Sequence, residues 1–215
     1  MVSLVLLSAL GLAATLSAAN LDETTLMPKF NLVSNCSFEA ADEAGKPKGW
    51  DLYAQPQHFS LADDALHGQK ALVAAAPEGT TKHTTARQTC TAIEGQELVL
   101  SAWLKVRRTD GKLIRVYLEF QDENEQRLSI QPADWAGNLD KWTKLEVKAQ
   151  APPLTARAVA LVPYLFGSAD VLVDAVSLAS ADGSPVTRPE AVVSNLRTVL
   201  RRPDYLRLAW DSNAD

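Results

Sequence analysis

Trp103 and Tyr117 are the two side chains of this sequence best placed to contact a ligand. In residues 98–106 and 114–120 every even-numbered position is apolar. Successive side chains of a strand point to opposite faces, so the even set is predicted to face a core and both aromatic rings to face solvent. A three-residue loop at 109–111, with Gly111 in the left-handed conformation, would join the strands in a hairpin that places Trp103 directly across from Tyr117.

Polar side chains surround this aromatic pair in the predicted register. A pyranose ring offers C–H faces that stack on aromatic rings, while its hydroxyl groups bond to charged and amide side chains. The pattern therefore predicts a carbohydrate-binding face made of Trp103, Tyr117, Glu119, Arg115, Gln121 and, from a strand at 156–166, Tyr164. The alternative is an ordinary cross-strand aromatic pair covered by a loop or by the C-terminal tail.

The strand at 156–166 has a less regular pattern. We expect Val159, Leu161, Pro163 and Leu165 to point inward, which leaves Tyr164 on the other face. Because proline lacks a backbone N–H, Pro163 indicates an edge strand or a bulge.

Charge and motifs argue against several classes of function. The net charge is −5 and lysine and arginine do not cluster, which argues against nucleic acid or an anionic membrane as partner. A glycan hydrolase needs two carboxylates about 5–9 Å apart, and the proposed face carries only Glu119. No nucleophile motif or phosphate-binding loop is present. The sequence therefore predicts a protein that is not an enzyme, with a glycan-active hydrolase or lyase as the minority reading.

The first residues have the character of an export signal. An apolar run over 2–16 is followed by Ser17-Ala18-Ala19, whose small residues fit cleavage after Ala19. We therefore expect residues 1–19 to be a signal peptide, the protein to be secreted to the extracellular space or periplasm, and no membrane span to remain after cleavage. A retained anchor is the alternative.

Cys36 and Cys90 are the two cysteines of the chain. An even number of cysteines in an exported protein favours a disulfide between them. Two unrelated buried thiols are the alternative.

Roughly ten short runs of strand-forming residues, separated by turn formers, cover residues 30–180. This spacing predicts an all-β protein, a jelly-roll β-sandwich of two antiparallel sheets, over residues 20–180. Residues 181–215 then form a linker and tail, with a short helix expected at 189–200. The tail could dock on the sandwich or bind a protein partner.

Five segments resemble, in the same order, carbohydrate-binding modules of the family 4/9 type: "NLVSNCSFE…GKPKGWDLY", "ADDALHGQKAL", "GQELVLSAWLKV", "DKWTKLEVKAQAPPLTARAVALVPYLF" and "ADVLVDAVSLAS". This resemblance covers roughly residues 30–180. It implies a galactose-binding-like jelly roll that binds a polysaccharide or oligosaccharide on one sheet face.

The resemblance also implies a structural calcium ion. Glu39 and Asp174 match ligand positions, together with a carboxylate from Asp63 or Asp64 and carbonyl groups near Lys70. Asp174 interrupts an apolar strand, and a buried carboxylate needs a cation or hydrogen-bond donors. Bonding of Asp174 to backbone amides is therefore the alternative to calcium.

Two positions depart from the family pattern. Cys36 replaces the usual small residue before "SFE", which fits a disulfide to Cys90, and Ala175 replaces a frequent second acid, which would weaken metal binding. We expect a secreted, non-catalytic carbohydrate-binding protein. The alternatives are a structural or adhesion module that binds protein at a cell surface, and a detached accessory module of a glycoside hydrolase.

Overall fold

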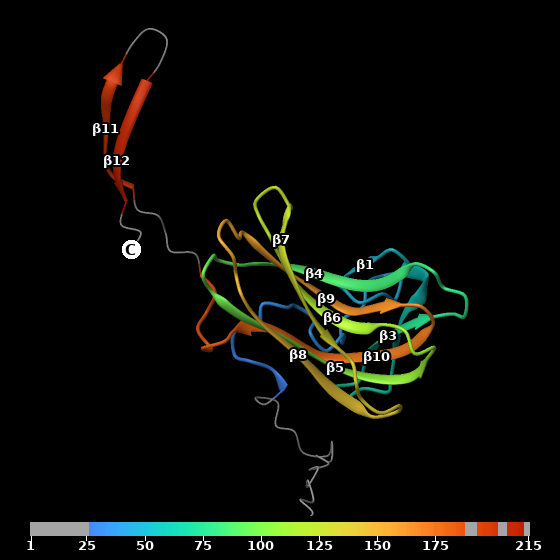
Figure 1. Cartoon of the computed structure of the whole chain (residues 1–215). Coiled ribbons are helices and arrows are strands. Elements are labelled where there is room, and N and C mark those ends of the chain that lie inside the picture. Colours follow the sequence, from blue (N-terminus) through green and yellow to red (C-terminus); the bar gives the residue numbers. More distant parts are fainter. Residues whose placement is uncertain (1–25, 188–192, 202–205, 213–215) are drawn as a thin grey trace, which may run out of the picture.

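Two five-stranded antiparallel sheets pack face to face in this computed structural model, which describes residues 26–187, 193–201 and 206–212 (Figure 1). Sheet 1 consists, in spatial order, of β1 (Asp51–Tyr53), β4 (His83–Thr91), β9 (Arg157–Phe166), β6 (Ile114–Gln121) and β7 (Arg127–Asp134). Sheet 2 consists of β2 (Phe59–Ala62), β3 (Ala71–Ala76), β10 (Ala169–Ser180), β5 (Glu97–Thr109) and β8 (Trp142–Gln150). One 3₁₀ turn, η2 (Pro56–His58), precedes β2. The predicted β-sandwich is confirmed.

The inward-facing residues predicted for β5 and β6 form the centre of the core. The even-numbered residues from 98 to 106 of β5 are fully buried, and those of β6 are buried to at least 96%, because the inner faces of the two sheets pack against each other. Each fully buried leucine or phenylalanine contributes roughly 1.5–3 kcal/mol through the hydrophobic effect. The alternation of apolar and polar residues therefore locates the core correctly.

The predicted β5–β6 hairpin is wrong. β5 pairs with β10 and β8 in sheet 2, while β6 pairs with β9 and β7 in sheet 1. Residues 110–113, with Gly111 at φ +80°, therefore cross between the sheets. Even-numbered side chains meet in one core whether the strands lie side by side or face each other, so the alternation does not distinguish the two arrangements.

Trp103 and Tyr117 consequently do not lie side by side. Trp103 is paired with Asp174 of β10 and Lys144 of β8, whereas Tyr117 is paired with Leu161 and Pro132 in the other sheet. Both rings alternate with core residues and so face outward, but from opposite sides of the sandwich.

β9 also differs from expectation in its first half. Ala158, Ala160 and Val162 belong to the core, so Val159 and Leu161 point to the outer face rather than inward. The pairing register with β4 shifts between Thr85 and Arg87, opposite the cis Val162–Pro163 peptide. This irregularity, which Pro163 indicated, restores Leu165 to the core and leaves Tyr164 outside, as predicted.

After residue 187 the described chain forms β11 (Val193–Arg201) and β12 (Leu206–Ser212), which pair with each other in a separate two-stranded ribbon (Figure 1). A strand thus occupies most of the segment for which a helix was expected. The predicted helix start at Pro189 and the predicted signal peptide at 1–19 lie outside the described residues. Within the described part of the chain, no helix has the length and hydropathy to cross a membrane.

Leu104→Ala tests the position of the core. We expect the free energy of unfolding to fall by about 2–5 kcal/mol, because the substitution leaves a cavity between the sheets. Urea denaturation followed by tryptophan fluorescence measures this loss. Arg107→Ala on the outer face of β5 is the control and should cost no more than about 1 kcal/mol; equal losses would contradict the assignment of Leu104 to the core.

Candidate functional site

The outer face of sheet 1 gathers five of the six predicted binding residues. Arg115 pairs with Tyr164, Tyr117 with Leu161, and Glu119 with Val159, so neighbouring strands place these side chains in successive rows across β6 and β9. Gln121 continues the line at the end of β6. Trp103 is the one predicted residue that the fold does not bring to this face.

Aromatic rings form a continuous row across four strands of sheet 1. The ring centroids of Tyr53 and His83 lie 5.6 Å apart, and those of His83 and Tyr164 lie 5.3 Å apart, both stacked. Tyr117 meets Tyr164 edge-on at 5.0 Å. Because β4 lies between β1 and β9, the His83 ring is flanked by tyrosines from both sides.

Guanidinium groups lie over two of these rings. Arg87 is 4.6 Å from the Tyr53 centroid and Arg115 is 5.2 Å from the Tyr117 centroid. Such cation–π contacts hold the rings in place. Much of the flat aromatic surface is therefore used within the protein, which leaves ring edges and hydroxyl groups for a ligand.

A trough of about 230 Å³ runs beside this row. Its floor is apolar and comes from Val159 and Leu161 of β9, and its remaining lining is polar or aromatic. The full lining consists of Tyr53, His83, Thr85, Arg87, Glu119, Gln121, Arg127, Val159, Leu161 and Tyr164. An apolar floor with convergent polar groups is the usual character of a ligand site.

Glu119 lies in this trough and is nearly buried, with a side chain only 6% exposed. Its Oε2 accepts from Arg127 Nε at 2.9 Å and its Oε1 accepts from Gln121 Nε2 at 2.6 Å. Both carboxylate oxygens are thus engaged by donors, as a buried charge requires. This arrangement fits a positioning group and not a free general base.

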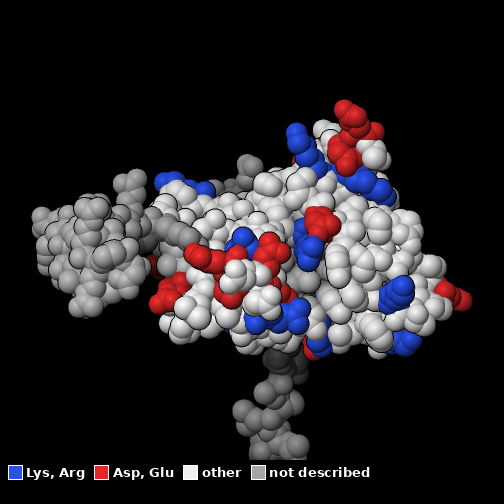
Figure 2. Space-filling view, turned by 90° about the horizontal axis from the view of Figure 1, so that it is seen from above, with Lys and Arg blue, Asp and Glu red and all other residues white. Residues whose placement is uncertain are grey.

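Arginines on this side of the sandwich are matched with acids. Their ion pairs are Arg87–Asp51, Arg115–Asp134, Arg127–Glu119 and Arg157–Glu125. On the face seen in Figure 2, basic and acidic side chains likewise lie next to each other in small groups separated by uncharged surface. That face has no continuous basic patch of the kind that nucleic acid requires.

Two larger hollows, of about 430 and 490 Å³, lie near the β6–β7 turn. Their linings consist of loop residues, among them Glu123, Asn124 and Leu154, and of residues at strand ends, and contain no aromatic ring. Because they lack the combination of rings, apolar floor and convergent donors, the trough on sheet 1 is the stronger candidate despite its smaller volume.

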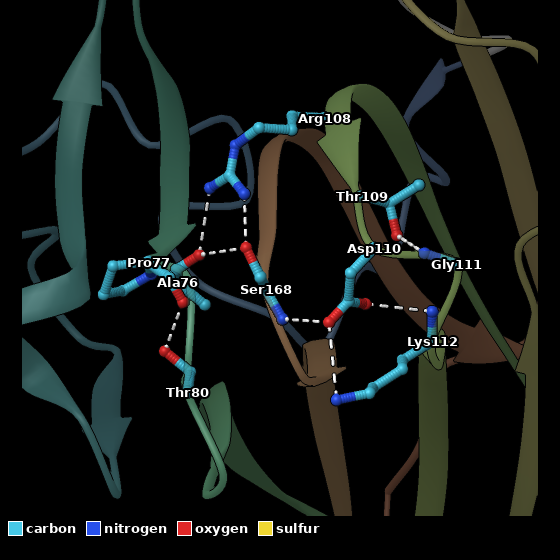
Figure 3. Close-up of polar contacts among 9 residues, drawn as sticks. All are labelled: Ala76, Pro77, Thr80, Arg108, Thr109, Asp110, Gly111, Lys112 and Ser168. Carbon is cyan, nitrogen blue, oxygen red and sulfur yellow. Dashed lines mark hydrogen bonds and ion pairs between the residues drawn. The ribbon is translucent and has the colours of Figure 1, made fainter.

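Three turns that lead into the site strands are tied together at one end of the sandwich (Figure 3). Asp110 accepts hydrogen bonds from Ser168 N and Lys112 N, both at 3.0 Å, and these two bonds lower the pKa of Asp110. Arg108 donates to Ser168 Oγ and to the carbonyl oxygen of Ala76. The network joins the end of β3, the β5–β6 crossing and the β9–β10 turn, so it holds the chain segments that lead into β4 and β6 and out of β9.

The loop at 63–70 covers the part of the outer face of sheet 2 that is formed by β3, β10 and the second half of β5. Asp64 pairs with Lys105 and Arg107 on that face of β5, and Ala65 and Trp142 pack on a small apolar cluster of β3 and β10. Trp103 lies in the same outer row of β5 and is half-buried. This face is therefore built as a packing surface, which agrees with the alternative raised for the tryptophan.

Asp174 and Glu39 hold this loop through its backbone. Asp174 Oδ2 accepts from Leu66 N at 2.7 Å and from His67 N at 2.8 Å, and Glu39 Oε1 accepts from Gln69 N at 2.9 Å and from Lys70 N at 3.0 Å. Gly68 sits between them at φ +73°, where a Cβ atom would collide with the Glu39 carboxylate. We call this arrangement the carboxylate clasp.

The clasp does not offer calcium a set of oxygen ligands. Backbone N–H groups, which cannot coordinate a cation, face the carboxylates of Glu39 and Asp174, and Asp63 forms an ion pair with Lys70. Across the described ranges no group of three or more His, Cys, Asp and Glu could hold a metal ion. The residues as arranged do not fit the ion, and calcium binding stays a prediction.

Cys36 and Cys90 are free thiols, so the predicted disulfide is not formed in this structure. Cys90 Sγ donates to the carbonyl oxygen of Leu32 at 3.4 Å, and burial raises the pKa of this thiol to about 11. Burial also raises the pKa of Cys36. Both side chains pack against the core, which is the alternative that the sequence left open.

Sequence reasoning missed Tyr53, His83, Arg87 and Arg127. Tyr53 belongs to a strand of three residues, and His83 is the first residue of β4. Neither has enough neighbouring pattern to assign its face. Arg87 does alternate with the buried Ala86 in "TTARQTC", and this was the one local signal that could have placed it outside.

Comparisons with known proteins support the fold. No protein-family model and no curated protein matches the chain. Among solved structures, the chain is similar to the enzymatically active domain of tailspike protein 4 of bacteriophage CBA120, with 15% identity and a TM-score of 0.56 over 70% of this chain and 21% of that one. It thus spans about a fifth of the tailspike structure.

Two carbohydrate-binding modules are matched over nearly their whole length. A family 16 carbohydrate-binding module gives 18% identity and a TM-score of 0.53 over 69% of this chain and 99% of the module. The C-terminal family 22 module of Clostridium thermocellum Xyn10B gives 12% identity and a TM-score of 0.52 over 71% and 99%. At these identities the likeness establishes a β-sandwich of the kind found in carbohydrate-binding modules.

The pKa of Asp174 yields a prediction about stability. Burial raises this pKa to about 6, although bonds from the backbone N–H groups of His67, Ala175 and Leu66 partly oppose the rise. An unfolded aspartate has a pKa near 4, so between about pH 4 and 6 the folded protein binds the proton more tightly. The contribution of Asp174 to the free energy of unfolding is therefore fully present below about pH 4. This contribution is lost as the pH rises through about 6, and the free energy of unfolding then falls by up to about 3 kcal/mol.

Urea denaturation at pH 4 to 7.5 in the presence of EDTA gives the free energy of unfolding of the protein and of Asp174→Asn, in which residue 174 cannot titrate. The difference between the two values at each pH measures the effect. A difference that stays constant over this pH range would contradict the prediction. A repeat with 1 mM Ca²⁺ in place of EDTA tests the calcium prediction, since a bound ion would favour ionised Asp174 and would stabilise the protein above pH 6.

Asp110→Ala should loosen the three joined turns without unfolding the sandwich. We expect several-fold faster amide hydrogen exchange at residues 166–169, because Ser168 N loses its acceptor, and this is measured by hydrogen–deuterium exchange with mass spectrometry. Asp182→Ala is the matched control, since Asp182 caps a comparable turn through Ser184 N at 2.9 Å, outside the network of Figure 3. Unchanged exchange at 166–169 would show that Asp110 does not hold the turn.

Proposed function

We propose that this protein binds a saccharide chain in the trough of sheet 1 and does not cleave it. The observation that carries the proposal is the trough itself, where an aromatic row, an apolar floor and convergent hydrogen-bonding groups meet on one exposed sheet face. A sugar ring has both C–H faces and hydroxyl groups, so it matches such a mixed lining.

The likeness to the family 16 and family 22 carbohydrate-binding modules supports the same proposal, because both are matched over 99% of their length. The family 22 structure is described as binding its ligand in a cleft. The likeness is one of fold, and the argument for binding therefore rests on the side chains of the trough.

The geometry changes the expected mode of recognition. Stacking on a free indole at Trp103 was expected, but that ring lies on the other sheet and the rings of Tyr53, His83 and Tyr164 stack on one another. We infer that hydrogen bonds to hydroxyl groups and guanidinium N–H groups, with contact to Val159 and Leu161, supply most of the binding.

A binding role without catalysis is favoured by the state of Glu119. It is the one carboxylate in the lining, and both of its oxygens already accept hydrogen bonds from Gln121 and Arg127. Acid–base cleavage of a glycosidic bond needs a second carboxylate and a proton that is free to move.

Two further points belong to the proposal. Export through the leader at 1–19 would place the protein where polysaccharides occur.

The likeness to one fifth of a larger tailspike enzyme fits the alternative of an accessory module that once belonged to an enzyme.

Tyr164→Ala tests the site. The change removes the ring that contacts both His83 and Tyr117, so we expect retention on a bound glycan to weaken at least about tenfold, equivalent to about 1.4 kcal/mol. A glycan array selects the ligand and affinity electrophoresis measures retention.

Trp103→Ala is the matched control on sheet 2 and should leave retention unchanged. Loss of retention with Trp103→Ala and not with Tyr164→Ala would move the site to sheet 2. Binding to no glycan on the array would remove the proposed function.

A further inference from the structure

Hydrogen-bond donors outnumber acceptors in the trough. A guanidinium carries five N–H donors, and Arg87 and Arg127 each use Nε on a carboxylate, Asp51 and Glu119 respectively. Both arginines line the same trough. Both oxygens of Glu119, the one carboxylate of the lining, already accept hydrogen bonds.

The acids that pair with these arginines differ in position. Asp51 is 57% exposed on the edge strand β1 and is absent from the trough lining, whereas Glu119 is nearly buried within it. Exposed ion pairs are weak because water and salt screen them, so Arg87 can exchange Asp51 for another anion at small cost. The trough therefore retains an available positive group beside its apolar floor.

The acidic character of the whole protein does not oppose an anion at this place. The net charge of −5 is spread over the molecule, and electrostatic effects at the surface fade over about 8 Å at physiological salt. Contacts inside the trough are shorter than this length, so the local groups decide.

We propose that the saccharide bound in the trough is a uronic-acid-containing glycan, whose carboxylates accept hydrogen bonds from Arg87 and Arg127 while a sugar ring lies on Val159 and Leu161. This inference rests on the proposed function and adds its ligand class. A planar carboxylate matches the planar guanidinium fork, and it adds a charged acceptor to a lining whose one carboxylate, Glu119, is already engaged. A neutral sugar, whose hydroxyl groups donate as well as accept, would leave more of these N–H groups unpaired.

Matched pairs of glycans test the proposal. Polygalacturonate, glucuronoxylan and alginate are each printed on an array beside their carboxyl-reduced forms, in which the linkages are kept and each carboxylate becomes a CH₂OH group. We expect at least one uronan to be retained about tenfold more strongly than its reduced form. This preference should decrease between 50 and 500 mM NaCl. Sulfated glycans on the same array report whether a sulfate replaces the carboxylate.

Arg87→Gln is the informative variant, because it removes the charge of Arg87 and leaves the ion pair between Arg127 and the nearly buried Glu119 intact. It should reduce the preference for the acid form several-fold, because only Arg127 then remains to bind the carboxylate, while Arg107→Gln, which removes a similar arginine from the outer face of sheet 2, should leave the preference unchanged.

Equal retention of both forms, a preference for the reduced form, or a preference for sulfate alone would overturn the ligand class and leave saccharide binding in place. Retention of no glycan at all would overturn both. An undiminished preference in Arg87→Gln would show that the anion binds elsewhere.

Discussion

The packing of two sheets against one shared core is the constraint on which the rest of this structure depends. β5 and β6 follow each other in the chain but lie in opposite sheets, and their even-numbered side chains meet between them. Because the even-numbered side chains point into the core, the odd-numbered side chains must point to the outer face of each sheet. Arg115, Tyr117, Glu119 and Gln121 must lie on the outer face of sheet 1, and Trp103 on the outer face of sheet 2.

The two outer faces have different chemistry because a loop packs on only one of them. The 63–70 loop lies over sheet 2, where Asp174 and Glu39 hold its backbone and Asp64 pairs with Lys105 and Arg107. The middle of sheet 1 is left open, so rings and guanidinium groups line a trough there. Ion pairs and stacked rings keep these side chains in place, which reduces the conformational entropy that a ligand would have to restrict on binding.

The fold and the site give different kinds of information. The likeness to carbohydrate-binding modules extends over about 70% of this chain at 12–18% identity, which identifies an architecture shared by proteins with many ligands. The ligand class has to be read from the lining, where donors exceed acceptors. The carboxylate clasp, too, has to be judged from its own contacts. The family resemblance led us to expect oxygen ligands for calcium there, whereas backbone N–H groups bond to the carboxylates of Glu39 and Asp174.

The amino-acid sequence by itself determined the all-β class, the inward and outward faces of β5 and β6, and the outward position of Tyr164, because alternation along a strand is a local property that burial enforces. Only the tertiary structure decided which strands are neighbours. Tyr53, His83 and Tyr164 meet because β1, β4 and β9 pair in that order, although more than a hundred residues separate the first from the last. Alternation is equally satisfied by a hairpin and by a crossing between sheets, so the partner of Tyr117 could not be found from the sequence. The order of strands is set by contacts between distant segments, which no local pattern records.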